Sequence, residues 1–252
     1  MTVNQFGHEI IWLEETHSTN TLVLGTESHL NNHGLVVAAN HQTEGRGRVG
    51  RKWASVPGEQ LQFSLVIHAT LPREDLSLLS LLAGLAVWDA IERETGLRPS
   101  LKWPNDVFLN NKKVCGILVE MKSRPSQAPV LVVGIGINCN GRQADFPEEL
   151  RAILTTIAHE QGGKPVNRDS LLKAILDAME SWYTRLSQGE RATMLNAWRE
   201  RAHLRGRGVV FPGKDGPQRG TAEDISSEGF LVIRTESGDY HHHHSGELVW
   251  ED

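Results

Sequence analysis

The sequence has few cysteines and no long apolar run, and both scarcities limit its class. Only two cysteines occur among 252 residues, which excludes a disulfide-stapled scaffold and favours a reducing, cytoplasmic location. Because Cys115 and Cys139 each lie in an apolar run, we expect both thiols to be buried packing groups. The longest apolar stretch, residues 76–88, contains two serines and is too short to cross a bilayer. No membrane association and no signal peptide are expected.

Basic charge is also in short supply. The 31 aspartates and glutamates outnumber the 26 lysines and arginines, which gives a net charge of −5. Proteins that wrap nucleic acid usually carry the opposite sign, so non-specific nucleic-acid binding is not expected, and any phosphate should be held locally. With 39% hydrophobic and 23% charged residues, the composition is that of a folded globular chain.

The spacing of apolar residues predicts an α+β domain, residues 1–203, followed by a small all-β domain, residues 204–252. After Leu204, short β-like runs separated by turn residues are typical of a small barrel. Helices are predicted over 21–30, 75–95, 167–186 and 191–201, and strands over 35–39, 61–69, 101–103, 106–109, 114–122, 130–138, 208–211, 220–225, 230–234 and 247–250.

Glycine and arginine are densest in residues 45–53, Gly-Arg-Gly-Arg-Val-Gly-Arg-Lys-Trp. Glycines let a backbone fold closely around an anion, and Arg46, Arg48 and Arg51 add forked donors. The segment has neither a Walker A ending nor a dinucleotide-binding spacing. It predicts a phosphate site, with a solvated surface loop as the alternative. Taken alone, Trp53 is predicted to be a core aromatic rather than a flat surface for a purine.

A second cluster is Lys102-Trp103-Pro104-Asn105-Asp106. Pro104 favours an extended Trp103, and we expect Lys102 and Asp106 on one face of a strand. They form either a surface ion pair or, through Asp106, a site for magnesium or an ammonium group.

Glycines also interrupt two apolar strands. Gly116 follows Lys113 in one, and Gly134 and Gly136 lie in the other. Glycine weakens a strand unless something must approach the backbone closely. Gly116 would let a ligand lie against the backbone, whereas Gly134 and Gly136 taken alone are only a weak signal for the wall of a ligand site.

Twelve histidines raise the question of a metal site, and four of them are consecutive, His241 to His244. Adjacent residues on a strand point to opposite faces, so these four cannot all bind one ion. The run is predicted to be a solvated loop, and no metal site made of side chains is predicted. No Gly-x-Ser-x-Gly motif or exposed, electropositive cysteine points to nucleophilic catalysis.

In combination and in order, these motifs resemble the biotin–protein ligase family. The resemblance rests on Ser18-Thr19-Asn20, Gln42, residues 45–53, residues 102–106, Lys113 with residues 116–120, and Gly134-Ile135-Gly136-Ile137-Asn138. It implies a mixed sheet with flanking helices, similar to class II aminoacyl-tRNA synthetases, and a C-terminal SH3-like domain in which Gly246-Glu247 match a short motif.

The resemblance also implies a reaction. Biotin is activated by ATP, with Mg²⁺, to biotinyl-5′-AMP and is then transferred to a lysine of the biotin carboxyl carrier protein of a biotin-dependent carboxylase. By resemblance, the catalytic residues are Arg48, Lys113, Asp106 and Lys102. The biotin site would comprise Ser18, Thr19, Asn20, Gln42, Gly45, Arg46, Gly47, Arg48, Lys113, Gly116, Leu118, Gly134 and Gly136. The adenylate site would comprise Arg48, Arg51, Trp53, Asn105, Ile137 and Asn138.

Two alternatives remain open at this point. One is a regulator that binds biotin or its adenylate without transferring it, and the other is a lipoate–protein ligase of the same fold. The charges at Arg48, Asp106 and Lys113 argue against a mere binder, and residues 45–53 and 102–106 favour biotin. Because Ser18 lies so near the start, no DNA-binding repressor domain is expected. A monomer or a homodimer is expected.

Overall fold

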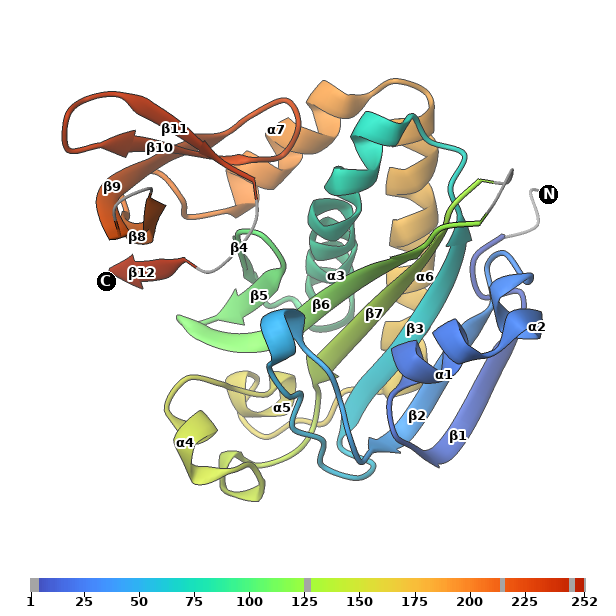
Figure 1. The fold of residues 1–252 in the computed structure, drawn as a ribbon. Coiled ribbons are helices and arrows are strands. Elements are labelled where there is room, and N and C mark those ends of the chain that lie inside the picture. The colour runs from blue at the N-terminus through green and yellow to red at the C-terminus, as the bar shows by residue number, and fades with distance from the viewer. Residues whose placement is uncertain (1–4, 125–127, 214–215, 245–247, 252) are drawn as a thin grey trace.

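The large sheet has seven strands in the order β1-β2-β3-β7-β6-β5-β4. Every neighbouring pair is antiparallel except β1 and β2, which run parallel. The structure is a computed structural model that describes residues 5–124, 128–213, 216–244 and 248–251 (Figure 1). The strands are β1 (Ile10–Thr16), β2 (Val36–Gln42), β3 (Gln60–His68), β4 (Ser100–Lys102), β5 (Asp106–Leu109), β6 (Lys112–Lys122) and β7 (Val130–Asn138).

Helices lie on both faces of this sheet (Figure 1). The long helices α3 (Leu79–Thr95) and α6 (Arg168–Ser187) cover one face and share the main hydrophobic core with it. The short helices α1 (Thr19–Gly25) and α2 (Glu27–Leu30) cover part of the other face through a smaller apolar cluster. The remaining helices are η1 (Arg48–Gly50), η2 (Arg73–Leu78), η3 (Gln143–Asp145), α4 (Glu148–Arg151), α5 (Ile157–Glu160) and α7 (Arg191–Arg201).

The two sheet faces differ because side chains alternate along each strand. Phe63 on β3 and Ile135 on β7 point into the main core. The residues that alternate with them along each strand face α1. Residues that pair directly across two strands share a face. On that face lie Gln62 and Ser64 of β3, Gly134 and Gly136 of β7, and Gly116 and Leu118 of β6, which are paired in register. Three glycines therefore stand side by side on the α1 face and leave it hollow.

Most predicted elements are confirmed, with shifted boundaries. The predicted helix 75–95 begins as the 3₁₀ helix η2 and becomes α3 at Leu79, and it ends at Gly96 with a left-handed φ of +74°. The predicted helix 21–30 is divided at Thr26 into α1 and α2, and Ser18 caps α1 by accepting from the Thr21 amide. Strand β1 was not predicted, because its edge position leaves Ile10 and Trp12 partly exposed and weakens the apolar signal.

The prediction that Lys102 and Asp106 lie on one strand is wrong. Residues 103–105 form a turn, so Lys102 ends β4 and Asp106 begins β5. The two residues are direct cross-strand partners, which places both on the same face for a different reason.

The small sheet has the order β11-β10-β9-β8-β12, and all its neighbouring pairs are antiparallel. Its form is consistent with an SH3-like domain. Glu247, predicted to begin the last strand, and Gly246 lie outside the described residues. The strands are β8 (Gly208–Gly213), β9 (Gly216–Ile225), β10 (Leu231–Thr235), β11 (Tyr240–His243) and β12 (Val249–Glu251).

The histidine run is not a solvated loop, contrary to the sequence prediction. His241, His242 and His243 belong to β11 and pair with β10. His243 is buried, and its ring makes an edge contact with Trp103 at a centroid distance of 5.7 Å. His241 stacks on Phe211 at 4.6 Å. Alternation along the strand explains this, because it turns every second histidine toward apolar neighbours.

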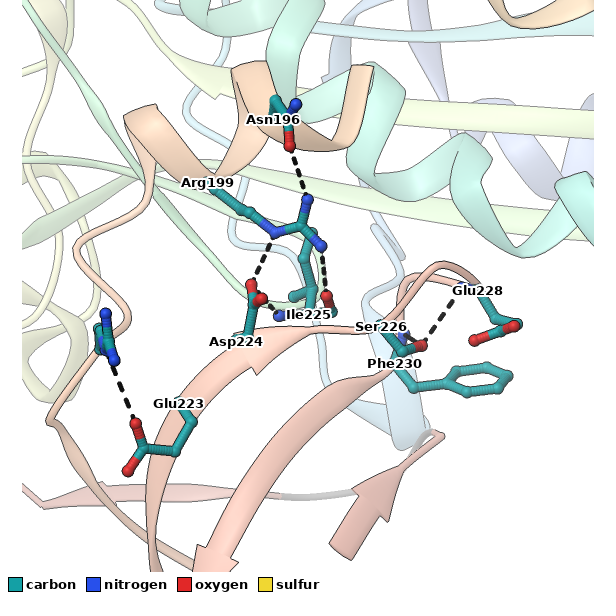
Figure 2. A network of polar contacts seen from close by, with 9 residues as sticks. Asn196, Arg199, Glu223, Asp224, Ile225, Ser226, Glu228 and Phe230 are labelled. Carbon is teal, nitrogen blue, oxygen red and sulfur yellow. Dashed lines mark hydrogen bonds and ion pairs between the residues drawn. The ribbon is translucent and has the colours of Figure 1, made fainter. Parts of the chain in front are cut away.

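The small sheet is docked on the larger part through α7 and the turn before β10. Arg199 of α7 donates to Asp224 at 2.6 Å and to the Ile225 carbonyl at 2.7 Å (Figure 2). Trp103 donates its indole N–H to the Gly229 carbonyl at 2.9 Å. Apolar residues of both parts belong to one core cluster. The domain boundary after residue 203 stays a prediction.

Both cysteines are buried and free, as the sequence predicted. Burial raises the pKa of the Cys139 thiol to about 12, and it also raises the pKa of Cys115. Neither thiol is therefore a nucleophile at neutral pH. Within the described ranges, no helix combines the length and apolar character needed to span a membrane.

Replacing Arg199 by Met should lower the free energy of unfolding by about 1–3 kcal/mol, because two acceptors at the junction lose their donor. Arg205→Met is the control, since that side chain is 85% exposed and its nearest approach to Glu223 is 3.7 Å. Its effect should stay under about 0.5 kcal/mol. Urea denaturation measures both. Equal effects of the two substitutions would contradict the docking described for Arg199.

His243 should make stability depend on pH. Burial lowers the pKa of its imidazole, and His241, His244 and Arg48 lower it further. An unfolded histidine binds a proton near pH 6.5, whereas the buried one resists it, so stability falls as pH drops below that value. His243→Phe should reduce the loss of stability between pH 7 and 5.5. The exposed His242, changed to Gln, is the control, and an unaltered loss in His243→Phe would contradict the assignment.

Candidate active site

A cavity of about 620 Å³ lies over the glycine-rich part of the sheet. Its floor is the α1 face of β6 and β7, and segment 45–53 covers it from one side. The turn before β5 and residues 150–154 form further walls, and Leu248 and Trp250 of the small sheet complete the lining. Elements far apart in the sequence therefore meet at one hollow.

A chain of hydrogen bonds fixes the polar groups at the α1 end of this cavity. Gln42 accepts from the Thr19 amide at 2.7 Å and donates to Gln62 at 2.9 Å. Ser64 donates to the Thr19 hydroxyl at 2.7 Å. These side chains are buried or half-buried, so their donors and acceptors keep fixed directions. Thr19 and Gln42 therefore present polar atoms to the cavity in fixed directions.

Asn20 occupies the space above Gly134. Its side-chain amide donates to the Leu118 carbonyl at 3.2 Å and to Glu120 at 2.9 Å. A Cβ atom on Gly134 would lie 2.9 Å from Asn20 Cγ, which is closer than real contacts allow. Gly134 is thus required for the position of Asn20.

Residues 45–53 form a hairpin-like segment over the cavity. The Trp53 amide donates to the Gly45 carbonyl at 2.9 Å, and the Gly47 amide donates to the backbone carbonyl of Arg51 at 2.7 Å. At the tip, Val49 is 67% exposed and has a left-handed φ of +52°, which a β-branched residue rarely adopts. The segment is hereafter called the 45–53 hairpin.

Trp53 is not a core residue, contrary to the expectation from its residue type alone. Its ring lies on the glycine floor, where a Cβ atom on Gly136 would be 2.6 Å from Cε2 and one on Gly116 would be 3.2 Å from Cζ3. The indole nitrogen is buried without a hydrogen-bond partner among the described residues. The ring is half-buried and forms a wall of the cavity.

The charged groups gather at the β5 end of the cavity. Lys113 Nζ lies 2.6 Å from Asp106 Oδ1. Arg48 donates to Asn105 at 3.4 Å. Burial lowers the pKa of the Arg48 guanidinium and nearby Asp106 opposes that effect, so the group stays cationic at neutral pH. The ammonium of Lys102 lies 4.9 Å from the centre of the Phe108 ring and 5.7 Å from that of Trp250. Fixed cations of this kind stabilise anionic oxygens.

The comparisons with known proteins agree with this geometry. Residues 12–138 match the model of the biotin/lipoate A/B protein ligase family. A bifunctional ligase/repressor BirA of Bacillus spizizenii is 32% identical over 232 residues, covering 92% of this chain and 71% of the relative. The chain belongs to the biotin/lipoate A/B protein ligase family.

Other relatives in this ligase family match nearly end to end. A biotin–[acetyl-CoA-carboxylase] ligase of Paracoccus denitrificans is 31% identical, covering 90% of this chain and 94% of its own. The biotin protein ligase of Aquifex aeolicus in complex with biotin and ATP superposes with a TM-score of 0.83 at 32% identity, covering 97% and 99% of the two chains. Residues 205–249 match the model of the biotin protein ligase C-terminal domain.

Nearly all residues that the sequence assigned to the site line the cavity. They are Ser18, Thr19, Asn20, Gln42, Arg46, Gly47, Arg48, Arg51, Trp53, Lys102, Asn105, Asp106, Lys113, Gly116, Leu118, Gly134, Gly136 and Asn138. Gly45 and Ile137 do not line it. Ile137 alternates with Gly136, so its side chain packs in the main core on the other face. The roles of all these residues toward a ligand stay predictions.

Asn138 lines the cavity but its amide is already engaged. It accepts from Gln60 at 2.8 Å and donates to the Thr155 carbonyl at 3.1 Å. The side chain therefore ties the end of β7 to the wall formed by residues 150–155.

Several residues that line or support the cavity were not assigned from the sequence. Strand alternation would have placed Gln62 and Ser64 on the glycine face, had the predicted strand been aligned with its neighbours. Trp250 reaches the cavity only because the small sheet docks there, and no local pattern indicates this or the wall at Phe146 and residues 150–154. Glu120 stands in the segment 116–120, from which only Gly116 and Leu118 were assigned, and its partners lie 74 and 100 residues away.

Gly136→Ala should lower the free energy of unfolding by about 1–3 kcal/mol, because the added methyl group overlaps the Trp53 ring. In a Trp53→Ala background, the cost of the same substitution should fall below about 0.5 kcal/mol. Gly25→Ala is the control, since nothing lies within 4 Å of its added Cβ atom. Urea denaturation of the four proteins in this cycle checks the claim. Equal costs in both backgrounds would show that Trp53 does not rest on the glycine floor.

Proposed function

We propose that this protein is an ATP-dependent biotin protein ligase that forms biotinyl-5′-AMP and transfers biotin to a lysine of a biotin carboxyl carrier protein. One observation carries the proposal. A cavity with a glycine floor places fixed polar groups at one end and Arg48, Lys102, Lys113 and Asp106 at the other. Family membership supports it, and the match of residues 205–249 to a biotin protein ligase domain favours biotin over lipoate.

In the first step, a carboxylate oxygen of biotin attacks the α-phosphorus of ATP. The bond between that phosphorus and the oxygen bridging to the β-phosphate breaks, and pyrophosphate leaves. Two anions must approach each other, so fixed positive charge is required where they meet. Lys113 and Arg48 supply this charge at the β5 end of the cavity. The Lys113 ammonium is held by Asp106, which keeps it in place before the substrates bind.

The polar end of the cavity suits the ring system of biotin. A ureido group has two N–H donors and one carbonyl acceptor, and it needs partners in fixed directions. Thr19 and Gln42 line the cavity next to the N-terminus of α1, and their hydrogen bonds to Ser64 and Gln62 behind them fix the directions of their polar atoms. The glycine floor lets Asn20 and the Trp53 ring lie close to the sheet, and both side chains line the cavity beside the ligand.

The second step joins biotin to its carrier. The amine of the acceptor lysine attacks the acyl carbon of the mixed anhydride, the bond from that carbon to the phosphate oxygen breaks, and AMP leaves as the amine loses a proton. Asp106 is the carboxylate in the cavity that can orient this amine. The 45–53 hairpin covers the cavity and limits the access of water to the anhydride.

Mg²⁺ enters with ATP as part of the substrate. Among the described residues, no three His, Cys, Asp or Glu side chains are grouped as metal ligands. Phosphates and water commonly supply most ligands of Mg²⁺ in nucleotide sites, and the ion neutralises charge on the departing pyrophosphate. The carrier of a biotin-dependent carboxylase is the proposed partner, and the free, buried cysteines agree with a reducing, cytoplasmic location.

ATP–pyrophosphate exchange tests the first step. We expect exchange that requires biotin and that lipoate does not support. Lys113→Ala should reduce the rate about 10²- to 10³-fold, since a fixed charge at the reacting centre is lost. Lys112→Ala is the control, because its side chain alternates to the other face of β6. Exchange with lipoate alone would move the protein to the lipoate branch. Biotin binding without any exchange would favour a regulator that only binds.

A further inference from the structure

Glu120 links two walls of the cavity, α1 and the 45–53 hairpin. Its carboxylate oxygen Oε1 accepts from Arg46 Nη2 at 2.7 Å, and Oε2 accepts from Asn20 Nδ2 at 2.9 Å. Arg46 belongs to the 45–53 hairpin, and Asn20 belongs to α1. The Glu120 side chain is 22% exposed and stands on β6, on the same face as Gly116 and Leu118.

The Arg46 guanidinium is held from two sides, and both lie away from the charged end of the cavity. Nη2 donates to Glu120, and Nη1 donates to Thr21 Oγ1 on α1 at 3.2 Å. The partners of Arg46 are thus a hydroxyl and a carboxylate of the protein itself. The guanidinium therefore anchors the hairpin.

The hairpin has two anchors on opposite arms. Arg46 and Lys52 face each other as an isolated backbone bridge, so Arg46 marks one arm and Trp53 ends the other. Trp53 rests on the glycine floor, whereas Arg46 is held by Glu120. The third contact, from Arg48 to Asn105, is long at 3.4 Å. Releasing Arg46 would leave the first arm without its charged contact to the sheet.

We propose that Glu120 is a positioning residue that holds both Asn20 and the 45–53 hairpin in the arrangement that binds biotin. This inference rests on the proposed function and extends it to a residue outside the reacting centre. Its effect is on binding, because a segment that is already ordered loses less conformational entropy when the ligand binds. Glu120 makes no contact with Lys113 or Asp106 among those described, so the chemical step should not depend on it.

A carboxylate is required because both partners are donors. Arg46 and Asn20 each present N–H groups, and an ionised glutamate accepts with both oxygens. A glutamine of the same shape would turn an NH₂ group toward one of these donors, so one contact would be lost. Glu120→Gln therefore changes the chemistry of the junction with little change in volume.

The test is the kinetics of biotin-dependent exchange in Glu120→Gln. We expect KM for biotin to rise about tenfold or more, as the loss of one charge-assisted hydrogen bond implies, with kcat within about twofold of wild type. Glu120→Asp keeps both acceptors on a shorter stem and should restore part of the loss. A lower kcat at unchanged KM, or no change in either constant, would overturn the proposal.

Glu223→Gln is the matched control. Glu223 is 21% exposed and accepts from Arg234 at 2.8 Å, so it resembles Glu120 in burial and in its arginine partner. It stands on β9 of the small sheet, away from the α1 end of the cavity. This substitution should leave KM for biotin unchanged. An equal rise of KM in both variants would attribute the effect to general destabilisation.

A second readout needs no substrate and separates this inference from the proposed function. Trypsin cuts after arginine and lysine, and the hairpin contains Arg46, Arg48, Arg51 and Lys52. Cleavage there in the ligand-free protein should be faster in Glu120→Gln than in wild type or Glu223→Gln. Faster cleavage together with an absence of biotin-dependent exchange in wild type would retain the anchor and reject the ligase. Unchanged cleavage would reject the anchor. If Glu120→Gln does not fold, Arg46→Lys tests the same contact by trypsin cleavage, since that side chain is 44% exposed and lysine keeps the cleavage site while it loses the two-sided fork.

Discussion

The site depends on a sheet face on which three neighbouring positions are glycine and carry no side chain. Gly116, Gly134 and Gly136 are neighbours across β6 and β7. A side chain would collide with Asn20 at Gly134 and with Trp53 at Gly136, and it would crowd Lys113 and Trp53 at Gly116. The opposite face of the same strands is filled with apolar side chains that pack on α3 and α6. Two-residue alternation thus builds the core and the cavity from the same strands. The glycines weaken the strands locally, and pairing on both sides by β3 and β5 compensates within the sheet.

The segments that cover the cavity lie outside the strands of its floor, and specific contacts hold them in place. The 45–53 hairpin lies over the floor through Trp53 and through the Arg46–Glu120 pair. The small sheet contributes Trp250 to the wall, and its docking through Arg199 and Gly229 reaches Trp103 next to Asn105 and Asp106. A change far from the cavity can therefore alter the geometry of its charged end. The proposed chemistry needs that geometry because carboxylate and phosphate are both anions and repel each other. Fixed cations must offset this negative charge where the two groups meet.

The sequence predicted much of this arrangement and missed some of it for physical reasons. Local signals placed α6, α7 and the central strands, because long amphipathic or apolar segments carry their own periodicity. Nearly all residues that the motifs assigned to the site line the cavity, but the wall at Phe146 and residues 150–154 and the lining from the small sheet were not predicted. The edge strand β1 and the histidine strand β11 were missed, since partial exposure and polar side chains hide a strand in the sequence. Lys102 and Asp106 were expected on one strand, but a turn at 103–105 made them cross-strand partners. Glu120 and Trp250 have roles that only tertiary contacts define.

We propose that the ligands bind in the cavity that the 45–53 hairpin covers. Hydrogen–deuterium exchange of the backbone amides, measured without ligand, with biotin alone and with biotin plus ATP, tests it most directly. We expect exchange to slow in residues 45–53 and in the segment around Lys113, with a larger effect when both ligands are present. Slower exchange confined to other parts of the chain, with the hairpin unchanged, would contradict the placement of the site.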